Sequence, residues 1–264
     1  MFFLCLNLSG QSYQSIQVSG FNIDLIAEGS GIPDRAAATT GTTFDLSGAG
    51  KEHVFYSKDF RGNANESIAP PLGLDPGRNY ASSATPSIVY QLAEYAGNNA
   101  LFLTSGTGKL TLSTPAIFEK LSFLATSITT QNITVKVSFT DRTFTNYPSI
   151  SFPDWLTETG YAVKGVGLVN RNADGAILAD AFSGDANKPN FFDCIVTLSA
   201  TDKLKLIKDV EFSGMTSSMA VFAVCGVTPA GSLAAPVAKN ATLATSTGFT
   251  ANWDIVAGAT KLQD

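Results

Sequence analysis

Few residues of the chain have the type and spacing that catalysis requires. The sequence holds one histidine, His53, on which any Ser-His-Asp arrangement would depend, and no Gly-x-Ser-x-Gly motif is present. A zinc site would need more histidine or cysteine ligands near His53, and none is there. The segment SGTGK, residues 105–109, lacks the spacing of a phosphate-binding loop and is typical of a hairpin turn. These patterns argue against nucleophilic and zinc-dependent catalysis.

Carboxylates are the remaining candidates for catalysis. Glycosidic hydrolysis needs only two of them at a suitable separation. The chain has 22 acidic residues, so pairs are inevitable and the sequence does not rank them. Hydrolysis therefore stays as the least favoured of three functions, and no residue is predicted to be catalytic.

The segment NRNADG, residues 170–175, is comparable with a calcium-binding loop. Asn170, Asn172 and Asp174 occupy its first, third and fifth positions, and Gly175 allows the bend. The twelfth position, where a bidentate glutamate belongs, is Ala181. A solvated Asn/Gly turn is the favoured interpretation, with calcium as the alternative and no other cofactor expected.

Aromatic side chains in irregular segments are the candidates for sugar binding. The C–H face of a sugar stacks on an aromatic ring, while neighbouring polar groups bind its hydroxyls. Loops at the end of a β-sandwich are where such sites tend to lie. The predicted ligand-binding residues are Tyr56, Phe60, Arg61, Tyr80, Trp155 and Tyr161. For Trp155, burial beneath a loop as a core residue is the favoured interpretation.

Composition narrows the class of protein. Hydrophobic residues make up 44% of the 264 residues and charged residues 15%, which supports a sizeable core and excludes a disordered chain. The net charge of −5 and the scattered basic residues argue against nucleic acid as a partner. No run approaches 18 uninterrupted apolar residues, so no membrane span is expected.

Hydrophobic patterning predicts an all-β fold. Residues 15–28 alternate as a half-buried strand, and residues 29–86 are irregular. From residue 87 to 227 short strands follow one another, with Ile133, Val135, Val137 and Phe139 on one face of a strand. A further strand is expected to begin at Leu204. We expect one closed β-sandwich with a single hydrophobic interior.

Cys194 and Cys225 both lie in apolar strand-like segments. A disulfide between them is one interpretation, and two buried free thiols are the favoured alternative. The sequence alone does not show whether their Cα atoms come within bonding range.

The two ends of the chain differ in character from its middle. Residues 1–14 have the pattern of a signal-peptide remnant, with an apolar stretch followed by small and polar residues, and an ordinary hydrophobic N-terminal strand is the alternative. Residues 15–228 are the predicted sandwich domain, and residues 229–235 are a linker of small residues and proline. Residues 236–264, with GFTANW ending at Trp253, resemble the first strands of a truncated fibronectin type III domain.

The main region also resembles a known kind of module. Segments such as VSGFNIDLIAE, GLDPG, GKLTLSTPAIFEKLSFLATS and AVFAVCGV resemble a jelly-roll β-sandwich of secreted multidomain bacterial proteins, of the galactose-binding or carbohydrate-binding-module kind. The pattern departs from this resemblance at TDRT, where Arg142 stands in place of an expected glycine.

The resemblance implies a noncatalytic carbohydrate-binding or adhesive accessory module of an exported protein, secreted or at the cell surface. Its expected partners are a glycan or cell-surface polysaccharide and the rest of a multidomain chain. A structural spacer without a ligand is the second hypothesis. Fold does not determine function, so the site must decide between them.

Overall fold

The computed structural model describes residues 13–28, 43–45, 53–60, 72–170, 182–183, 187–228, 238–242 and 250–253. The chain divides into a compact unit, Ser12–Thr228, and a second unit that includes Pro229–Asp264. The first unit is all-β, with one short 3-10 helix, η1 (Asp202–Leu204), among its described residues. No helix in the described part of the chain is long and apolar enough to cross a membrane.

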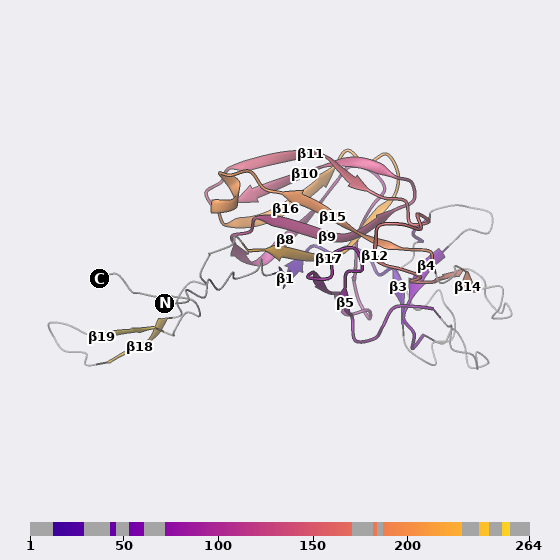
Figure 1. Cartoon of the computed structure of the whole chain (residues 1–264), viewed down its shortest axis with the longest axis horizontal. Helices are drawn as coiled ribbons and strands as arrows, with labels where there is room; N and C mark the ends of the chain where they lie inside the picture. Colours follow the sequence, from indigo (N-terminus) through magenta and orange to yellow (C-terminus); the bar gives the residue numbers. More distant parts are fainter. Residues whose placement is uncertain are drawn as a thin grey trace, which may run out of the picture. The chain divides into compact units, whose positions relative to one another are not determined.

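Two antiparallel sheets form a β-sandwich (Figure 1). In order, the first contains β1 (Tyr13–Ile16), β17 (Met219–Val227), β9 (Lys120–Ser127), β15 (Phe191–Thr197) and β12 (Tyr161–Val163). A sixth strand, β7 (Leu101–Leu103), also pairs with β17. The second sheet contains β11 (Phe144–Phe152), β10 (Gln131–Phe139), β16 (Ile207–Ser213), β8 (Thr107–Ala116) and β2 (Val18–Ser19). The prediction of an all-β sandwich is therefore confirmed.

The interior between the sheets follows from period-two alternation. Ile133, Val135, Val137 and Phe139 on β10 are all buried, as predicted, and pack with residues of β9, β15, β16 and β17. Among these contacts, Phe123 and Phe212 meet edge to face at 5.0 Å. Because alternate side chains of an antiparallel strand point to opposite faces, one face of β10 is buried and the other is partly exposed to solvent.

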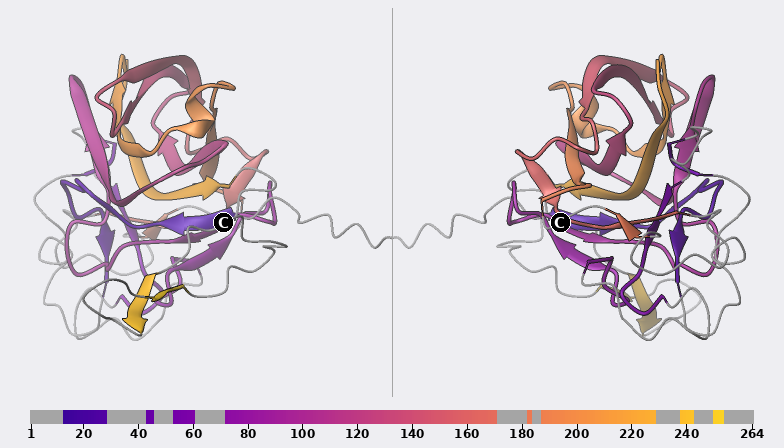
Figure 2. Two further views of the ribbon diagram at one scale, coloured as in Figure 1. Left: turned by 90° about the vertical axis from the view of Figure 1, so that its left-hand side faces the viewer. Right: turned by 90° about the vertical axis from the view of Figure 1, so that its right-hand side faces the viewer.

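The expectation of a single interior is wrong, because the outer face of the first sheet is covered as well. All nine residues of β17 are buried, as expected for a strand covered on both faces. Its Phe222 and Cys225 lie in a second hydrophobic cluster with residues from the early part of the chain, such as Phe44 and Phe55. The unit therefore has a third layer of short strands and loops against the sandwich, seen in the turned views of Figure 2.

Short strands build this third layer. β3 (Ile26–Ala27) pairs in parallel with β4 (His53–Tyr56), which continues to β13 (Leu168–Asn170) and β14 (Phe182–Ser183). A separate hairpin joins β5 (Asn79–Ala81) and β6 (Val89–Gln91). The predicted alternation over residues 15–28 breaks down here, since Asp24, Leu25, Ile26 and Ala27 are consecutively buried.

Two boundaries in the structure differ from the predicted ones. β1 begins at Tyr13, and Tyr13 and Gln14 pair with Val227 and Gly226, so these two residues belong to the folded unit and not to the predicted segment 1–14. The strand expected from Leu204 begins at Ile207 instead. The cause is the turn of η1, in which the amide of Lys205 donates to the carbonyl of Asp202.

The hairpin at TDRT joins β10 and β11, and Arg142 has a φ of 70°. Glycine is favoured in this left-handed region, which explains why a glycine was expected there. The side chain of Asp141 accepts hydrogen bonds from the amide and the hydroxyl of Thr143, which closes the turn without one.

Cys194 and Cys225 are both buried free thiols. Cys194 pairs in register with Phe123, and Cys225 with Ser122, so β9 lies between the two cysteine strands. Neighbouring strands are about 4.8 Å apart, which puts the two Cα atoms roughly 10 Å from each other. Cys194 faces the sandwich interior and Cys225 the second cluster. A disulfide between them is therefore excluded by geometry.

The second unit contains one antiparallel hairpin, β18 (Ala238–Thr242) with β19 (Thr250–Trp253). Ala238 pairs with Trp253. Two successive strands are what the sequence predicts for this segment.

Candidate functional site

Three of the predicted sugar-binding aromatics are interior residues. Tyr56 and Phe60 are 1% and 0% exposed and pack with Ala27, Val54 and Val169. Trp155 is 7% exposed, with its ring 4.9 Å from that of Phe44. For Tyr56 and Phe60 the expectation of an exposed ring is wrong, because both rings fill the interior of the third layer, whereas for Trp155 the prediction of burial as a core residue is confirmed. None of the three has a free face for a sugar.

The other predicted binding residues are half-buried or lie outside the described residues. Tyr80, on β5, is half-buried, and its hydroxyl accepts a hydrogen bond from the amide of Asp75. Tyr161, on β12, is half-buried, with the Lys164 ammonium 5.8 Å from its ring centre. Arg61 falls outside the described residues.

Most of the segment that was compared with a calcium-binding loop lies outside the described part of the chain. Asn170 ends β13 and pairs with His53, whereas Asn172 and Asp174 are not among the described residues. Within the described ranges no group of three or more His, Cys, Asp or Glu side chains could hold a metal ion.

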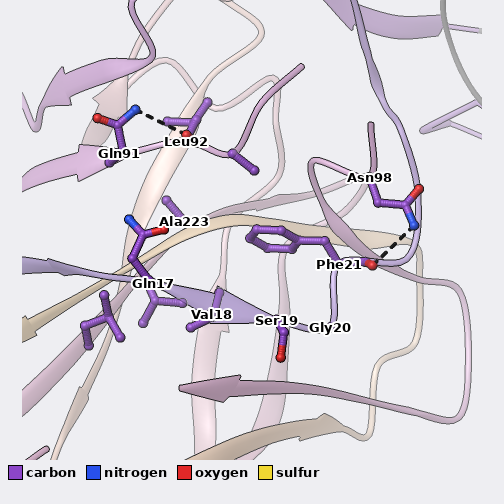
Figure 3. Close-up of a pocket in the computed structure, with 12 residues that line it drawn as sticks. Gln17, Val18, Ser19, Gly20, Phe21, Gln91, Leu92, Asn98 and Ala223 are labelled. Atoms are coloured by element: carbon purple, nitrogen blue, oxygen red, sulfur yellow. Dashed lines mark hydrogen bonds between the residues drawn. The ribbon is translucent and has the colours of Figure 1, made fainter. Parts of the chain in front are cut away.

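The structure contains a hollow that the sequence analysis did not point to. It has a volume of about 320 Å³, at the small end of ligand pockets. We call it the edge groove (Figure 3). Its lining residues are Ile16, Gln17, Val18, Ser19, Gly20, Phe21, Gln91, Leu92, Ala93, Asn98, Ala223 and Val224.

A gap along one edge of β17 creates the edge groove. On this edge β7 pairs with Met219–Val221 and β1 pairs with Val224–Val227. Neither strand reaches Phe222 or Ala223, where the register of β17 against β9 also shifts. Ala223 and Val224 line the groove at this gap. The hollow thus follows from the sheet pairing and not from a missing side chain.

The chain segment after β1 forms one wall, because it crosses from the first sheet to the second. β1 ends at Ile16, and β2 pairs with β8 two residues later. The turn back depends on Gly20, whose φ is 114° and whose Cβ position would lie 2.3 Å from the carbonyl oxygen of Lys109. A residue with a side chain would therefore push this wall away from β8. Phe21 follows directly and remains half-buried.

Residues 91–98 form the other wall, and side chains from outside the groove fix it. The guanidinium of Arg78 donates to the carbonyl of Leu92 at 3.1 Å and pairs with Glu94 at 2.6 Å. The hydroxyl of Tyr95 donates to the carbonyl of Asp75. Asn99, which is fully buried, donates from Nδ2 to the carbonyl of Tyr95. These contacts within the chain hold the wall in one conformation, which preorganises it.

A buried hydrogen-bond network holds β6 in place behind Gln91. The hydroxyl of Tyr90 donates to Oδ1 of Asp193 at 2.7 Å and lies 2.6 Å from Oγ of Ser122. Ser82 donates from Oγ to the other oxygen of Asp193. Burial, followed by the charge of Asp193, raises the pKa of Tyr90 well above its usual range. Tyr90 therefore stays a neutral donor, and Gln91, the next residue along β6, lines the groove.

Neutral amides and one aromatic ring characterise the lining. Gln17 is exposed; its backbone carbonyl accepts a hydrogen bond from the amide of Ser113, whereas its side chain makes none with the part of the chain that the structure describes. Gln91 donates from Nε2 to the carbonyl of Leu92, and Asn98 donates from Nδ2 to the carbonyl of Phe21 (Figure 3). None of the twelve lining residues carries a charge. The groove therefore offers directional hydrogen bonds beside an apolar ring.

Two carboxylates of the third layer, Asp24 and Glu28, make stability depend on pH. Asp24 accepts a hydrogen bond from Nδ2 of Asn99 at 2.7 Å. Burial raises the pKa of Asp24 to about 6. Burial, with the negative charges of Asp24 and Asp59, raises the pKa of Glu28 to about 7. Both groups favour the folded state when protonated, so their contribution is complete below pH 4 and disappears as the pH passes through 6 and 7.

We expect the free energy of unfolding to fall by about 2 kcal/mol between pH 5 and pH 8, as measured by urea unfolding. Glu28→Gln should remove a large part of this fall, because the amide carries no charge to desolvate. Glu158→Gln, at an exposed position, serves as the control and should leave the profile unchanged. Stability that is constant or rises from pH 5 to pH 8 would contradict this assignment.

The sequence contained a weak signal for the edge groove. Gln17, Gly20 and Phe21 fall within residues 15–28, the segment predicted to be a regular strand. A glycine before an aromatic residue in a strand pattern indicates a bend or a close backbone approach. Gln91 and Asn98, more than 70 positions away along the chain, could be joined to them only by the tertiary structure.

Comparison with known proteins assigns no family: no protein-family model matches the chain, and no curated protein matches it.

Proposed function

We propose that the protein is a noncatalytic carbohydrate-binding accessory module and that the edge groove is its sugar site. The observation that carries this proposal is the uncharged lining, which combines the ring of Phe21 with three carboxamide side chains. Aromatic stacking beside amide hydrogen bonds is the chemistry that recognises a sugar ring. The site thus differs from the loop aromatics that the sequence singled out.

The finer architecture belongs to the same proposal. A jelly-roll sandwich followed by the first strands of a fibronectin type III module, in an exported bacterial protein, is the context in which such a module would work. A single groove of about 320 Å³ predicts weak affinity for one sugar unit. Attachment to a multivalent chain or surface would raise the overall avidity.

A structural spacer remains the alternative, and the uncharged lining favours binding over hydrolysis. Hydrolysis of a glycosidic bond requires a carboxylic acid and a second carboxylate beside the bond. None of the residues that line the edge groove is an aspartate or glutamate. The preorganised wall of residues 91–98 favours a ligand over a spacer, because a spacer needs no fixed hollow.

The test is a binding screen of the full chain against immobilised neutral oligosaccharides of glucose, galactose and mannose. Phe21→Ala should weaken binding about tenfold through the loss of ring stacking, and Gln17→Ala should weaken it several-fold. Phe144→Ala removes a 58% exposed ring on β11 and should have no effect. Gln14→Ala is the matching amide control, on the same strand region but outside the lining.

Two outcomes would overturn the proposal. A folded protein that binds none of the oligosaccharides would favour the spacer. Binding that survives Phe21→Ala and Gln17→Ala alike would place the sugar site elsewhere on the molecule.

A further inference from the structure

The unused hydrogen-bonding atoms of the edge groove define which sugars it accepts. The amide nitrogens of Gln91 and Asn98 already donate to backbone carbonyls. Their carbonyl oxygens, Oε1 and Oδ1, accept no hydrogen bond from the described residues. Gln17 adds a whole amide that is also free within the described ranges. Three side-chain amide oxygens, those of Gln17, Gln91 and Asn98, are therefore free to accept a hydrogen bond from a ligand.

Free acceptors distinguish one class of sugar from another. A sugar hydroxyl both donates and accepts, so it can satisfy an amide oxygen. A carboxylate or sulfate group only accepts, and at the same place it would face an amide oxygen without any shared proton. Burying such an anion without a cation or sufficient donors is strongly unfavourable.

The charges around the groove also disfavour an anionic ligand. No lysine or arginine side chain lines it. Arg78, which supports the wall of residues 91–98, is already paired with Glu94 at 2.6 Å. Behind the same wall, Asp24 is hydrogen-bonded to Asn99, so its charge above pH 6 disfavours a second anion nearby.

We propose that the edge groove selects an uncharged, hydroxyl-donating sugar unit and rejects uronic acids and sulfated sugars. This inference rests on the proposed function and narrows its ligand to one chemical class. The small volume of about 320 Å³ fits a single sugar unit with its neighbour better than an extended chain segment.

Selectivity is measured with matched ligands on the full chain. Calorimetric titrations compare a neutral hexose oligosaccharide with its hexuronic acid counterpart of the same linkage and length, at low and at high salt. The neutral ligand should bind at least about tenfold more tightly. Its affinity should not change with salt, because no ion pair is formed.

A variant designed to remove the selectivity against acidic ligands provides a second test. Gln17→Lys places a cation at the exposed edge of the groove and should bring the acidic ligand within about threefold of the neutral one, with an affinity that falls as salt is added. Gln14→Lys adds the same charge to β1 outside the lining and should leave the selectivity unchanged.

The outcomes separate this inference from the proposed function. If the acidic ligand binds the unaltered chain as tightly as the neutral one, and Phe21→Ala weakens both, the sugar site stands and the selectivity is wrong. If neither ligand binds, both proposals fall. If the unaltered chain prefers the neutral ligand and Gln17→Lys reduces that preference, the result supports both the sugar site and its selectivity.

Discussion

Trp155→Ala is expected to lower the free energy of unfolding by about 3–5 kcal/mol, the range for removing a large aromatic residue from a core. The Trp155 ring is 7% exposed and contacts the ring of Phe44 at 4.9 Å and that of Phe55 edge-on at 6.1 Å. Its backbone also joins two segments, since its amide donates to Ser127 and its carbonyl accepts from Asn190. Removing the ring leaves a cavity that these contacts hold open.

Urea unfolding of the full chain gives the measurement, with Phe144→Ala as the control. Phe144 is 58% exposed, so its removal should change stability by less than about 0.5 kcal/mol. The opposite result, a small loss of stability for Trp155→Ala together with a loss of sugar binding, would restore Trp155 as a binding residue.

The second large effect is expected at Gly20, where stability and the edge groove depend on the same residue. Gly20→Ala should destabilise the protein by about 2–5 kcal/mol, from backbone strain at a φ of 114° and from overlap with the carbonyl oxygen of Lys109 at 2.3 Å. Because Phe21 follows Gly20, any variant that still folds should also bind the neutral oligosaccharide more weakly.

Gly106→Ala is the comparison, at a milder positive φ and without any overlap. Gly106 also has a positive φ, 73°, but no atom lies within 4 Å of its Cβ position. Only the strain remains there, so the expected loss is about 1 kcal/mol, read from the same urea curves. If Gly20→Ala is no more harmful than Gly106→Ala, the close approach of Gly20 to β8 is wrong.

The sandwich was predictable because half-buried antiparallel strands leave a period-two pattern. β10 shows this directly, with Ile133, Val135, Val137 and Phe139 in the interior. The third layer was not predictable from periodicity. Strands buried on both faces, such as β17, read as continuous apolar runs. The short strands of the third layer are too brief to establish a period.

The predicted site was wrong in part because the third layer could not be predicted from periodicity. Aromatic residues among glycines and prolines were expected in exposed loops, but Tyr56 and Phe60 fill the interior of the third layer. Trp155 lies in the core, as its favoured interpretation predicted. The edge groove arises where β1 and β7 stop short of each other along β17. Strand ends of this kind depend on pairing between distant segments, which no local pattern contains.

Amide NMR of the full chain, titrated with the neutral oligosaccharide that binds best in the screen, tests most directly whether the edge groove is the sugar site. The largest shifts are expected at the backbone and side-chain amides of Gln17, Gln91 and Asn98 and at the backbone amide of Phe21. Shifts confined to Tyr80, Tyr161 or the β10–β11 hairpin would contradict it.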